Sequence, residues 1–258
     1  AEASALAKLS LDADTIVLVG ERAASVPGLL TACANAGTKV AWIPRRAGEI
    51  GAIDAGCLPN VLPGGRPMTD AARVDVASAW GVASLPKDKG LDADAQLAAL
   101  ASGKLKALIA GGIQPTDFAD AHAMRFALEG APFVISLETR VSEVTERADV
   151  VFPVVLIEQQ SGTFLNWEHR RGRVERVIKD NSVAMTDLRV LAALADALGA
   201  DLGVRLPSQA LAEFDELGSW DGERPAMPAA PTAKSSAMVL ASWRQLIDGS
   251  ASNAGATA

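Results

Sequence analysis

Apolar segments alternate with Ala- and Leu-rich segments near the start of the chain. Residues 15–20 (TIVLVG) form a continuous apolar run that ends in glycine, which is typical of a buried parallel strand. Residues 28–36 read as a helix, because they are rich in Ala and Leu and Gly37 follows them in the position of a C-cap. Residues 39–44 (KVAWIP) read as a second strand, so the spacing predicts a βαβ unit with parallel strands and a right-handed crossover.

The same alternation returns further along the chain. It predicts helices at residues 93–102 and 118–129 and strands at residues 105–110, 133–137 and 150–155. Strands that alternate with helices in this way favour an α/β fold built on a doubly wound, mostly parallel sheet of the Rossmann type. A last helix is predicted after the cap Thr186-Asp187, since apolar side chains recur there at helical spacing before a terminal glycine: Leu188, Leu191, Ala192, Ala195, Leu198 and then Gly199.

Two segments break this pattern. Prolines and glycines cluster in CLPNVLPGGRP, within residues 45–91, which predicts a long irregular excursion of the kind that often carries function. After Arg205 the periodicity fades, and residues 224–236 have the Pro-, Ala- and Ser-rich composition of a linker. The sequence therefore predicts an α/β domain over residues 1–205 and a linker with a partly disordered tail over residues 206–258.

Composition restricts the possible partners. The chain has 258 residues, of which 49% are hydrophobic, and this is sufficient to bury a large core. Its net charge of -7 opposes nucleic-acid binding, because that affinity comes from Lys and Arg that neutralise phosphates. The longest apolar runs are far shorter than the roughly 20 residues that cross a bilayer. Residues 1–10 do not resemble a secretory signal, so we expect a cytoplasmic protein without direct membrane insertion.

Residue types that perform catalysis or bind metals are sparse in this sequence. Cys33 and Cys57 match no zinc or iron–sulfur spacing and are predicted to be small buried thiols. His122 and His169 are the two histidines, and no HExxH, GxSxG or P-loop motif is present. We therefore expect no catalytic residues and no metal ligands in this chain.

Ligands of doubly wound sheets bind beyond the carboxyl ends of the strands, and three strand ends are candidates here. The loop at residues 20–28 lacks GxGxxG, which opposes a dinucleotide at that position. The loop that begins Gly111-Gly112 and ends at Pro115 could turn backbone amides toward an anion, although an ordinary tight turn is the alternative. The third end leads through residues 147–179 into a Gly-Thr-Phe turn and a basic run.

The basic run carries five Lys or Arg side chains against a single Glu between His169 and Lys179. Arginine pairs well with carboxylate and phosphate groups. Three interpretations stay open: a solvated or internally paired face, a subunit or domain interface, and a bound pyrophosphate. The acidic net charge of the chain favours pairing over a phosphate ligand.

Three successive segments carry a resemblance to a known family. GGIQP, SLETRVSEVTERADVVFP and SGTFLNWEHRRGRV resemble segments of the molybdopterin oxidoreductases that line the dinucleotide arm of the cofactor. Within that family, VGERAASVPG, AWIPRRAGEIGAIDAGCLPNVLPGGRP and GTFLNWEHRRG are similar to the G subunits of bacterial, actinobacterial-type respiratory NADH:quinone oxidoreductase, complex I. This similarity covers residues 15–222 and extends to VLASWRQLIDG near the end of the chain.

The resemblance implies a pterin-dinucleotide site, for which the matching residues are Gly111, Gly112, Gln114, Pro115, Glu138, Gly162, Thr163 and Asn166. Three positions depart from the pattern of active members: Gln114 stands in place of Asn, Glu138 in place of Asp, and His169 in place of Gly. Because these changes displace hydrogen bonds and add bulk, we expect a vestigial site that holds no molybdopterin. The interface residues expected instead are Arg170, Arg171 and Arg173.

The resemblance also implies a function and a location. The chain would be a non-catalytic scaffold within the peripheral arm of complex I, which passes electrons from NADH through iron–sulfur clusters to quinone. Those 4Fe-4S and other clusters are expected in a cysteine-rich N-terminal part that is absent here, and the partners are other subunits of the arm. Such an arm lies peripherally on the cytoplasmic side of the bacterial membrane.

Two other functions stay open at this point. One is a fragment of a molybdopterin-dependent oxidoreductase, similar to formate dehydrogenase, that binds a molybdopterin guanine dinucleotide. The other is a free-standing α/β module that binds a small anion at residues 111–116.

Overall fold

A computed structural model describes residues 8–9, 11–21, 23, 26, 28–44, 48–118, 120–179 and 183–225. Helices and mostly parallel strands alternate along these residues, which confirms the predicted α/β class. The linker and tail predicted over residues 206–258 lie outside the described residues from residue 226 onward. No described helix has the length and apolar character needed to cross a membrane.

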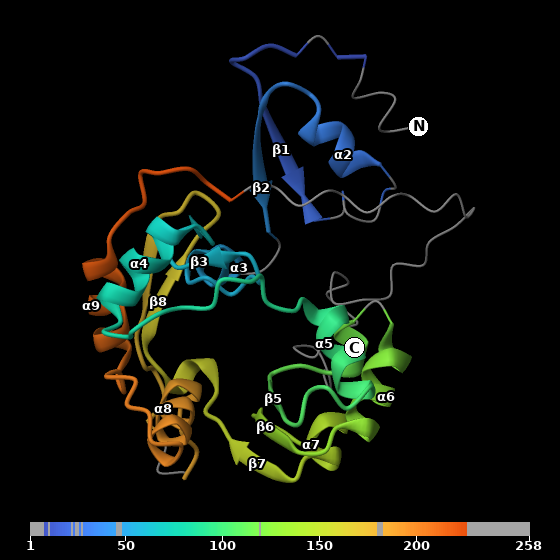
Figure 1. Cartoon of the computed structure of the whole chain (residues 1–258), viewed down its shortest axis with the longest axis vertical. Helices are drawn as coiled ribbons and strands as arrows, with labels where there is room; N and C mark the ends of the chain where they lie inside the picture. Colours follow the sequence, from blue (N-terminus) through green and yellow to red (C-terminus); the bar gives the residue numbers. More distant parts are fainter. Residues whose placement is uncertain are drawn as a thin grey trace.

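The predicted βαβ unit is present near the start of the chain. Strands β1 (Ile16–Gly20) and β2 (Lys39–Ile43) are parallel and are joined through helix α2 (Leu29–Ala34). The helix ends earlier than predicted, because Asn35 and not Gly37 is its C-cap. Gly37 follows in the turn to β2 with φ 71°, in the left-handed region that suits glycine. Figure 1 shows α2 lying against the β1–β2 pair, with this unit set apart from the rest of the molecule.

A second parallel sheet contains β5 (Leu108–Gly111), β6 (Val134–Glu138) and β7 (Val150–Pro153), in that order. Helices α5 (Ala93–Ala101), α6 (Ala121–Gly130) and α7 (Glu143–Arg147) connect these strands or precede them. Their apolar side chains and one face of the sheet form a core of buried residues: Leu97, Leu100, Ala110, Met124, Ala127, Leu128, Ala131, Val134 and Val144.

Helix α8 (Asp187–Ala197) covers the other face of this second sheet. Its Val190 packs with Leu137 of β6 and with Val154, so the sheet carries helices on both faces. Thr186 caps the helix as predicted, because its hydroxyl accepts a hydrogen bond from the Arg189 amide. The predicted apolar face was partly wrong: Leu191 and Leu198 are exposed, because α8 contacts the sheet through Val190.

The parallel strands therefore lie in two sheets, β1–β2 and β5–β6–β7. Two antiparallel pairs complete the strands: β3 (Val61–Leu62) with β4 (Arg66–Pro67), and β8 (Gly162–Leu165) with β9 (Arg171–Val174). The hairpin β8–β9 falls within the segment that the sequence marked as a turn followed by a basic run.

The excursion predicted over residues 45–91 is less irregular than expected, because regular elements fill much of it. Helices α3 (Glu49–Asp54) and α4 (Asp70–Ala79) flank the short β3–β4 hairpin. Gly64 and Gly65 have φ 75° and 70°, and two adjacent glycines allow this tight reversal at low cost. The Pro- and Gly-rich composition therefore marked a hairpin turn rather than the absence of structure.

Helix α9 (Pro207–Leu217) lies within the segment that was expected to be a linker. It packs against α4 and β8, and the carbonyl oxygens at its end accept hydrogen bonds from Arg66. The folded part of the chain therefore continues past the boundary expected at residue 205.

Candidate functional site

The first half of the predicted site lies at the carboxyl edge of the second sheet. Gly111 ends β5, Gly112 follows it with φ 60°, and Glu138 ends the neighbouring strand β6. Gln114 and Pro115 begin the short 3₁₀ helix η2 (Pro115–Asp117). The structure thus brings these five predicted residues to one edge, as expected for parallel strands.

The polar groups at this edge are bonded within the chain. The amide of Gly112 donates to the Leu137 carbonyl at 3.1 Å, and the amide of Gln114 donates to Asp117 Oδ2 at 2.9 Å. Glu138 Oε1 accepts a hydrogen bond from the Thr139 amide at 2.9 Å. Two amides and one carboxylate oxygen are therefore already occupied.

Asp117 also places a carboxylate directly in this loop. Its Oδ1 atom is buried and, among the described residues, has no hydrogen-bond partner. A carboxylate bonded to the Gln114 amide opposes a bound anion at the same loop. The loop has the geometry of a capped tight turn, which was the alternative to an anion site.

The second half of the predicted site lies on the β8–β9 hairpin. Gly162 and Thr163 begin β8, and Asn166 starts the turn that leads into β9. Asn166 Oδ1 accepts hydrogen bonds from the amides of Glu168 and Arg170, each at 2.9 Å. His169 closes the turn with φ 59°, in the left-handed region where glycine is favoured. The amide side chain of Asn166 therefore holds the turn.

The three arginines predicted for an interface differ in their partners. Arg171 Nη2 donates to Asp215 Oδ1 of α9 at 2.8 Å and links the hairpin to that helix. Arg170 lies 3.4 Å from Glu168, and Arg173 lies 3.2 Å from Glu175, in pairs between neighbours along the chain. The side chains of Arg170 and Arg173 are 76% and 78% exposed, so these two ion pairs contribute little to the free energy of unfolding.

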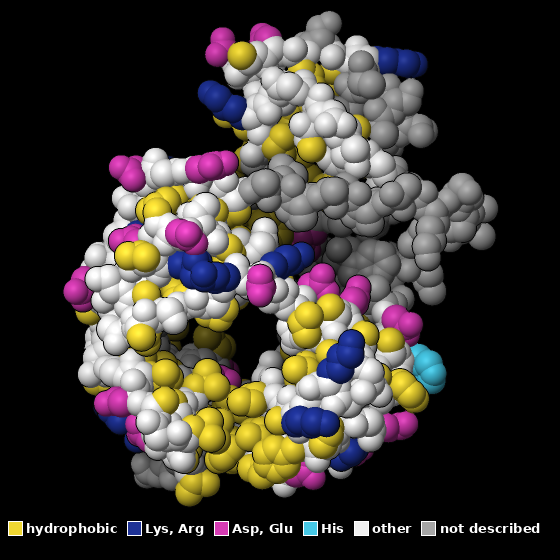
Figure 2. Space-filling view, in the orientation of Figure 1, with side chains coloured by type: hydrophobic (Ala, Val, Ile, Leu, Met, Phe, Trp, Pro, Cys, Tyr) yellow, Lys and Arg dark blue, Asp and Glu magenta, His cyan; other side chains and the backbone are white. Residues whose placement is uncertain are grey.

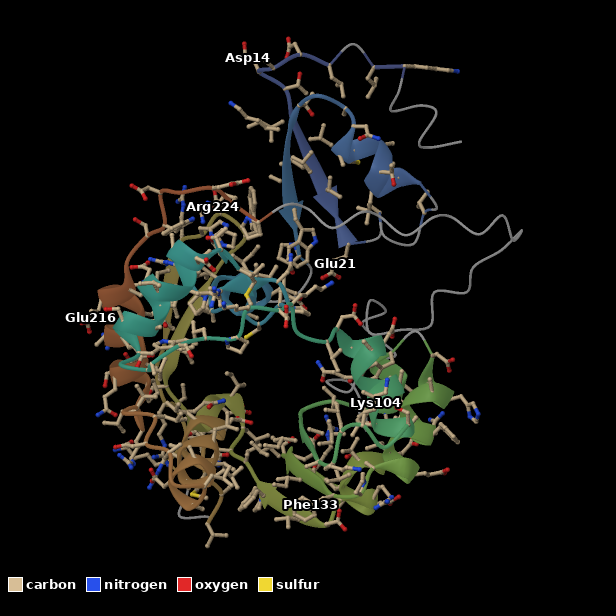
Figure 3. All side chains as sticks on the ribbon, in the orientation of Figure 1. Asp14, Glu21, Lys104, Phe133, Glu216 and Arg224 are labelled. Carbon is tan, nitrogen blue, oxygen red and sulfur yellow. The ribbon has the colours of Figure 1, made fainter. Side chains whose placement is uncertain are left out.

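Two cavities of about 500 and 520 Å³ adjoin Arg171. The first lies between α3, β8 and α9, with Thr163, Phe164 and Phe214 in its wall. The second is lined by His169, Trp220 and Arg224, among others. The side chain of Arg224, which is labelled in Figure 3, donates a hydrogen bond to the Gly64 carbonyl at 3.0 Å.

Neither of these cavities is lined by the first half of the predicted site. Figure 2 shows a hollow between the part of the molecule that carries β5–β7 and the part that carries β8. The first cavity is thus lined by Gly162 and Thr163 of the second half of the predicted pterin-dinucleotide site.

Sequence reasoning missed the contribution of α9 to these cavities. Phe214 lines both cavities and Asp215 pairs with Arg171. A helix signal was available, because Pro207 stands at the first helical position and Leu211 and Phe214 follow at helical spacing.

Cysteines and other possible metal ligands are scattered over the described residues. Cys33 is buried as predicted, but Cys57 is exposed in the turn after α3, which corrects the prediction of two buried thiols. In the part of the chain that the structure describes, no three His, Cys, Asp or Glu side chains are grouped as metal ligands.

Helices on both faces of a parallel sheet, with glycine loops at its carboxyl edge, define a doubly wound α/β domain. A profile of the molybdopterin oxidoreductase family matches residues 8–197 of this domain. The chain therefore belongs to the molybdopterin oxidoreductase family.

Individual relatives refine this assignment. The chain is 48% identical over 245 residues to the G subunit of NADH-quinone oxidoreductase from Mycobacterium tuberculosis. The matched region covers 90% of this chain and 30% of the relative. It is 47% identical over 247 residues to the protein of the same name from Streptomyces coelicolor, and this match covers 90% of the chain and 29% of the relative. The alpha subunit of an F420-dependent formate dehydrogenase from Methanococcus maripaludis is 31% identical over 169 residues. This match covers 65% of the chain and 24% of the relative. The chain thus spans less than a third of the length of each of these relatives.

Proposed function

We propose that this chain is the molybdopterin oxidoreductase-type domain of a G subunit and serves as a scaffold in NADH:quinone oxidoreductase. The similarity to two actinobacterial proteins with that name, each over 90% of this chain, supports this assignment. In this proposal the complex transfers electrons from NADH to quinone, translocates protons and lies on the cytoplasmic face of the membrane. The domain itself supplies packing and docking surfaces.

One observation carries the scaffold proposal. Two of the side chains that correspond to the pterin-dinucleotide site, those of Asn166 and Glu138, accept hydrogen bonds from neighbouring amides. A cofactor bound through these oxygens would exchange hydrogen bonds that the chain already makes, which reduces the net gain in free energy. We therefore propose that the site holds no molybdopterin, and that iron–sulfur clusters are carried by another part of the parent protein.

The exposed arginines of the hairpin are proposed to contact neighbouring subunits of the peripheral arm. Arg170 and Arg173 project with weak local partners, whereas Arg171 is bound to α9. Arginine is enriched at protein interfaces because its planar guanidinium pairs with carboxylates in a fixed geometry. The proposed contacts are acidic patches on the partner subunits.

Metal and pterin analysis of the purified full-length parent protein tests the scaffold proposal. We expect iron and labile sulfide, no stoichiometric molybdenum, and no fluorescent pterin after oxidative extraction. Molybdenum and pterin at one equivalent per chain would overturn the proposal and favour the formate dehydrogenase-like alternative. A known molybdoenzyme purified in the same way is the positive control for extraction.

A pair of double variants tests the interface. Replacing Arg170 and Arg173 with Ala is expected to lower the amount of assembled complex on native gels at least several-fold. Replacing Lys87 and Lys89 with Ala removes the same charge from an exposed loop and is expected to leave assembly unchanged. Equal assembly of the two variants would contradict the interface role of the hairpin.

A further inference from the structure

The hairpin β8–β9 has one covered edge and one open edge. Strand β8 packs against α3 and α9 (Figure 1), and a methyl group on Gly51 of α3 would lie 3.7 Å from the Leu165 amide nitrogen. Strand β9 pairs with β8 alone among the described strands. An open edge strand offers its main-chain amides and carbonyls to a strand of another molecule.

The hydrogen bonds of the hairpin show which groups face this open edge. The Asn166 amide donates to the Arg170 carbonyl at 3.0 Å, so these two residues form a hydrogen-bonded pair at the turn. Hydrogen-bonded and non-hydrogen-bonded pairs alternate along an antiparallel ladder, so the register makes positions 171 and 173 of the second kind. The amides and carbonyls of Arg171 and Arg173 therefore point to the open edge. Within the described residues, neither amide donates to a main-chain carbonyl outside the hairpin.

The charge along this edge selects an acidic partner. Five Lys or Arg side chains lie between His169 and Lys179 against a single Glu, in a chain whose net charge is -7. The side chain of Arg173 is 78% exposed, and its ion pair with Glu175, whose side chain is 71% exposed, holds it only weakly. Side chains directly opposite on neighbouring strands lie about 4.5–5.5 Å apart at Cβ, a separation that lets arginine pair with a carboxylate.

An apolar patch continues this surface where β9 ends. Val177 and Ile178 are 81% and 48% exposed, and both of their amides donate to the Glu158 carbonyl at 2.9 Å. These hydrogen bonds hold the two residues beside Ile157, which is 65% exposed. The apolar patch of these three side chains, next to a basic strand edge, matches a segment that carries both carboxylates and an apolar residue.

We propose that an extended acidic segment of a neighbouring subunit adds to β9 as a further strand. Its main chain bonds to the outward amides and carbonyls of Arg171 and Arg173, and one of its carboxylates pairs with the Arg173 guanidinium. An apolar side chain of the same segment packs on the apolar patch. This inference rests on the proposed scaffold role in NADH:quinone oxidoreductase and deepens it, because it names the kind of segment bound and adds main-chain hydrogen bonds to the arginine contacts.

A proline at position 173 separates strand pairing from side-chain contact. Arg173→Pro and Arg173→Ala both remove the guanidinium, but only proline removes the outward amide, and proline is tolerated at an open edge. We expect Arg173→Pro to lower the amount of assembled complex on native gels about tenfold below that of Arg173→Ala. The matched pair Lys89→Pro and Lys89→Ala, in an exposed loop, is expected to assemble equally.

Equal assembly of Arg173→Pro and Arg173→Ala would overturn the strand pairing. The scaffold role would stand in that case if the double variant of Arg170 and Arg173 still impaired assembly, because the arginines would then act through their side chains alone. The two proposals therefore fail in different ways.

Reversal of the charge tests the acidic character of the partner. Arg173→Glu is expected to assemble several-fold less well than Arg173→Ala, because like charges directly opposite on neighbouring strands are destabilising. Assembly of the Glu variant at the level of the Ala variant or above it would overturn an acidic partner.

Hydrogen–deuterium exchange tests the pairing without any variant. We expect the amides of Arg171 and Arg173 to exchange about tenfold slower in the assembled complex than in the purified full-length parent protein. Peptides covering β6 are the internal reference and are expected to exchange equally in both samples. Equal exchange of β9 in both samples would overturn the proposal. Slow exchange of β9 already in the purified parent protein would also overturn it, because the edge would then be occupied within that protein or by a second copy.

Discussion

The guanidinium of Arg66 donates from Nε to the carboxylate of Asp75 at 2.7 Å, with the arginine side chain 2% exposed and the aspartate side chain 44% exposed. The same guanidinium lies 5.3 Å from the centroid of the Trp220 ring. Its remaining donors bind three main-chain carbonyl oxygens, those of Pro63, Leu217 and Gly218. One buried charge thus fastens the β3–β4 hairpin to α4 and to the end of α9.

Replacement of Arg66 by Met is expected to lower the free energy of unfolding by about 3 kcal/mol, because buried carbonyl oxygens lose their donors and the ion pair is broken. Asp75 is half exposed and stays hydrated, which limits the loss. Urea denaturation followed by circular dichroism measures the change. Arg173→Met, at a 78% exposed side chain, is the control and is expected to change stability by less than about 0.5 kcal/mol. Equal effects of the two substitutions would contradict the fastening role of Arg66.

The ring of Phe164 packs over Gly172 of β9 and leaves no room for a larger side chain there. A methyl group at this position would lie 2.6 Å from Cε1 of Phe164, so the ring must move to make room for it. Gly172→Ala is therefore expected to destabilise the chain by about 1–2 kcal/mol, measured as a shift of the denaturation midpoint. Gly162→Ala in the same hairpin meets no atom within 4 Å and is the matched control.

The Phe164→Leu background tests the cause of that loss. If the ring is responsible, Gly172→Ala costs less in this background, and the double-mutant cycle yields a coupling free energy between the two positions. An unchanged cost would assign the loss to the backbone of β9 instead.

Local signals were sufficient to predict much of the fold. The apolar run that ends in Gly20 was predicted as a strand and forms β1, and the predicted cap Thr186 begins α8. Both features depend on neighbouring residues alone. The carboxyl edge that contains Gly111 and Glu138 was also predicted, since parallel strands end at a common edge.

Contacts between distant segments were not predictable in the same way. Nothing near Arg66 in the sequence indicates that its donors meet Leu217 and Gly218 at the end of α9. The face of α8 was misjudged at Leu191 for the same reason, because the position of the sheet selects which apolar residues are buried. For the candidate site, the sequence placed Arg171 in a basic run but could not reveal Asp215 as its partner.

His169 carries a backbone conformation that glycine adopts more readily. Its φ of 59° agrees with the family resemblance, in which glycine occupies the matching position. His169→Gly is expected to change the free energy of unfolding by less than about 1 kcal/mol, because relief of strain offsets the greater entropy of the unfolded glycine. His169→Val is expected to destabilise the chain by about 1–2 kcal/mol, since a β-branched residue fits this region poorly. Calorimetry of both variants measures the effect, and a Val variant as stable as the Gly variant would contradict it.

The Arg125–Glu143 pair makes stability depend on pH. Arg125 Nε and Nη2 donate to the Glu143 carboxylate at 2.6 and 2.9 Å, and these hydrogen bonds hold the pKa of Glu143 below its ordinary value of 4.5. A lowered folded pKa adds stability above the unfolded pKa, and this stability is lost as pH falls through the folded pKa. Glu143→Gln is therefore expected to lower the melting temperature at pH 7 but not at a pH below the folded pKa. Glu216→Gln is the control, and a Glu143→Gln deficit that persists in acid would contradict the linkage.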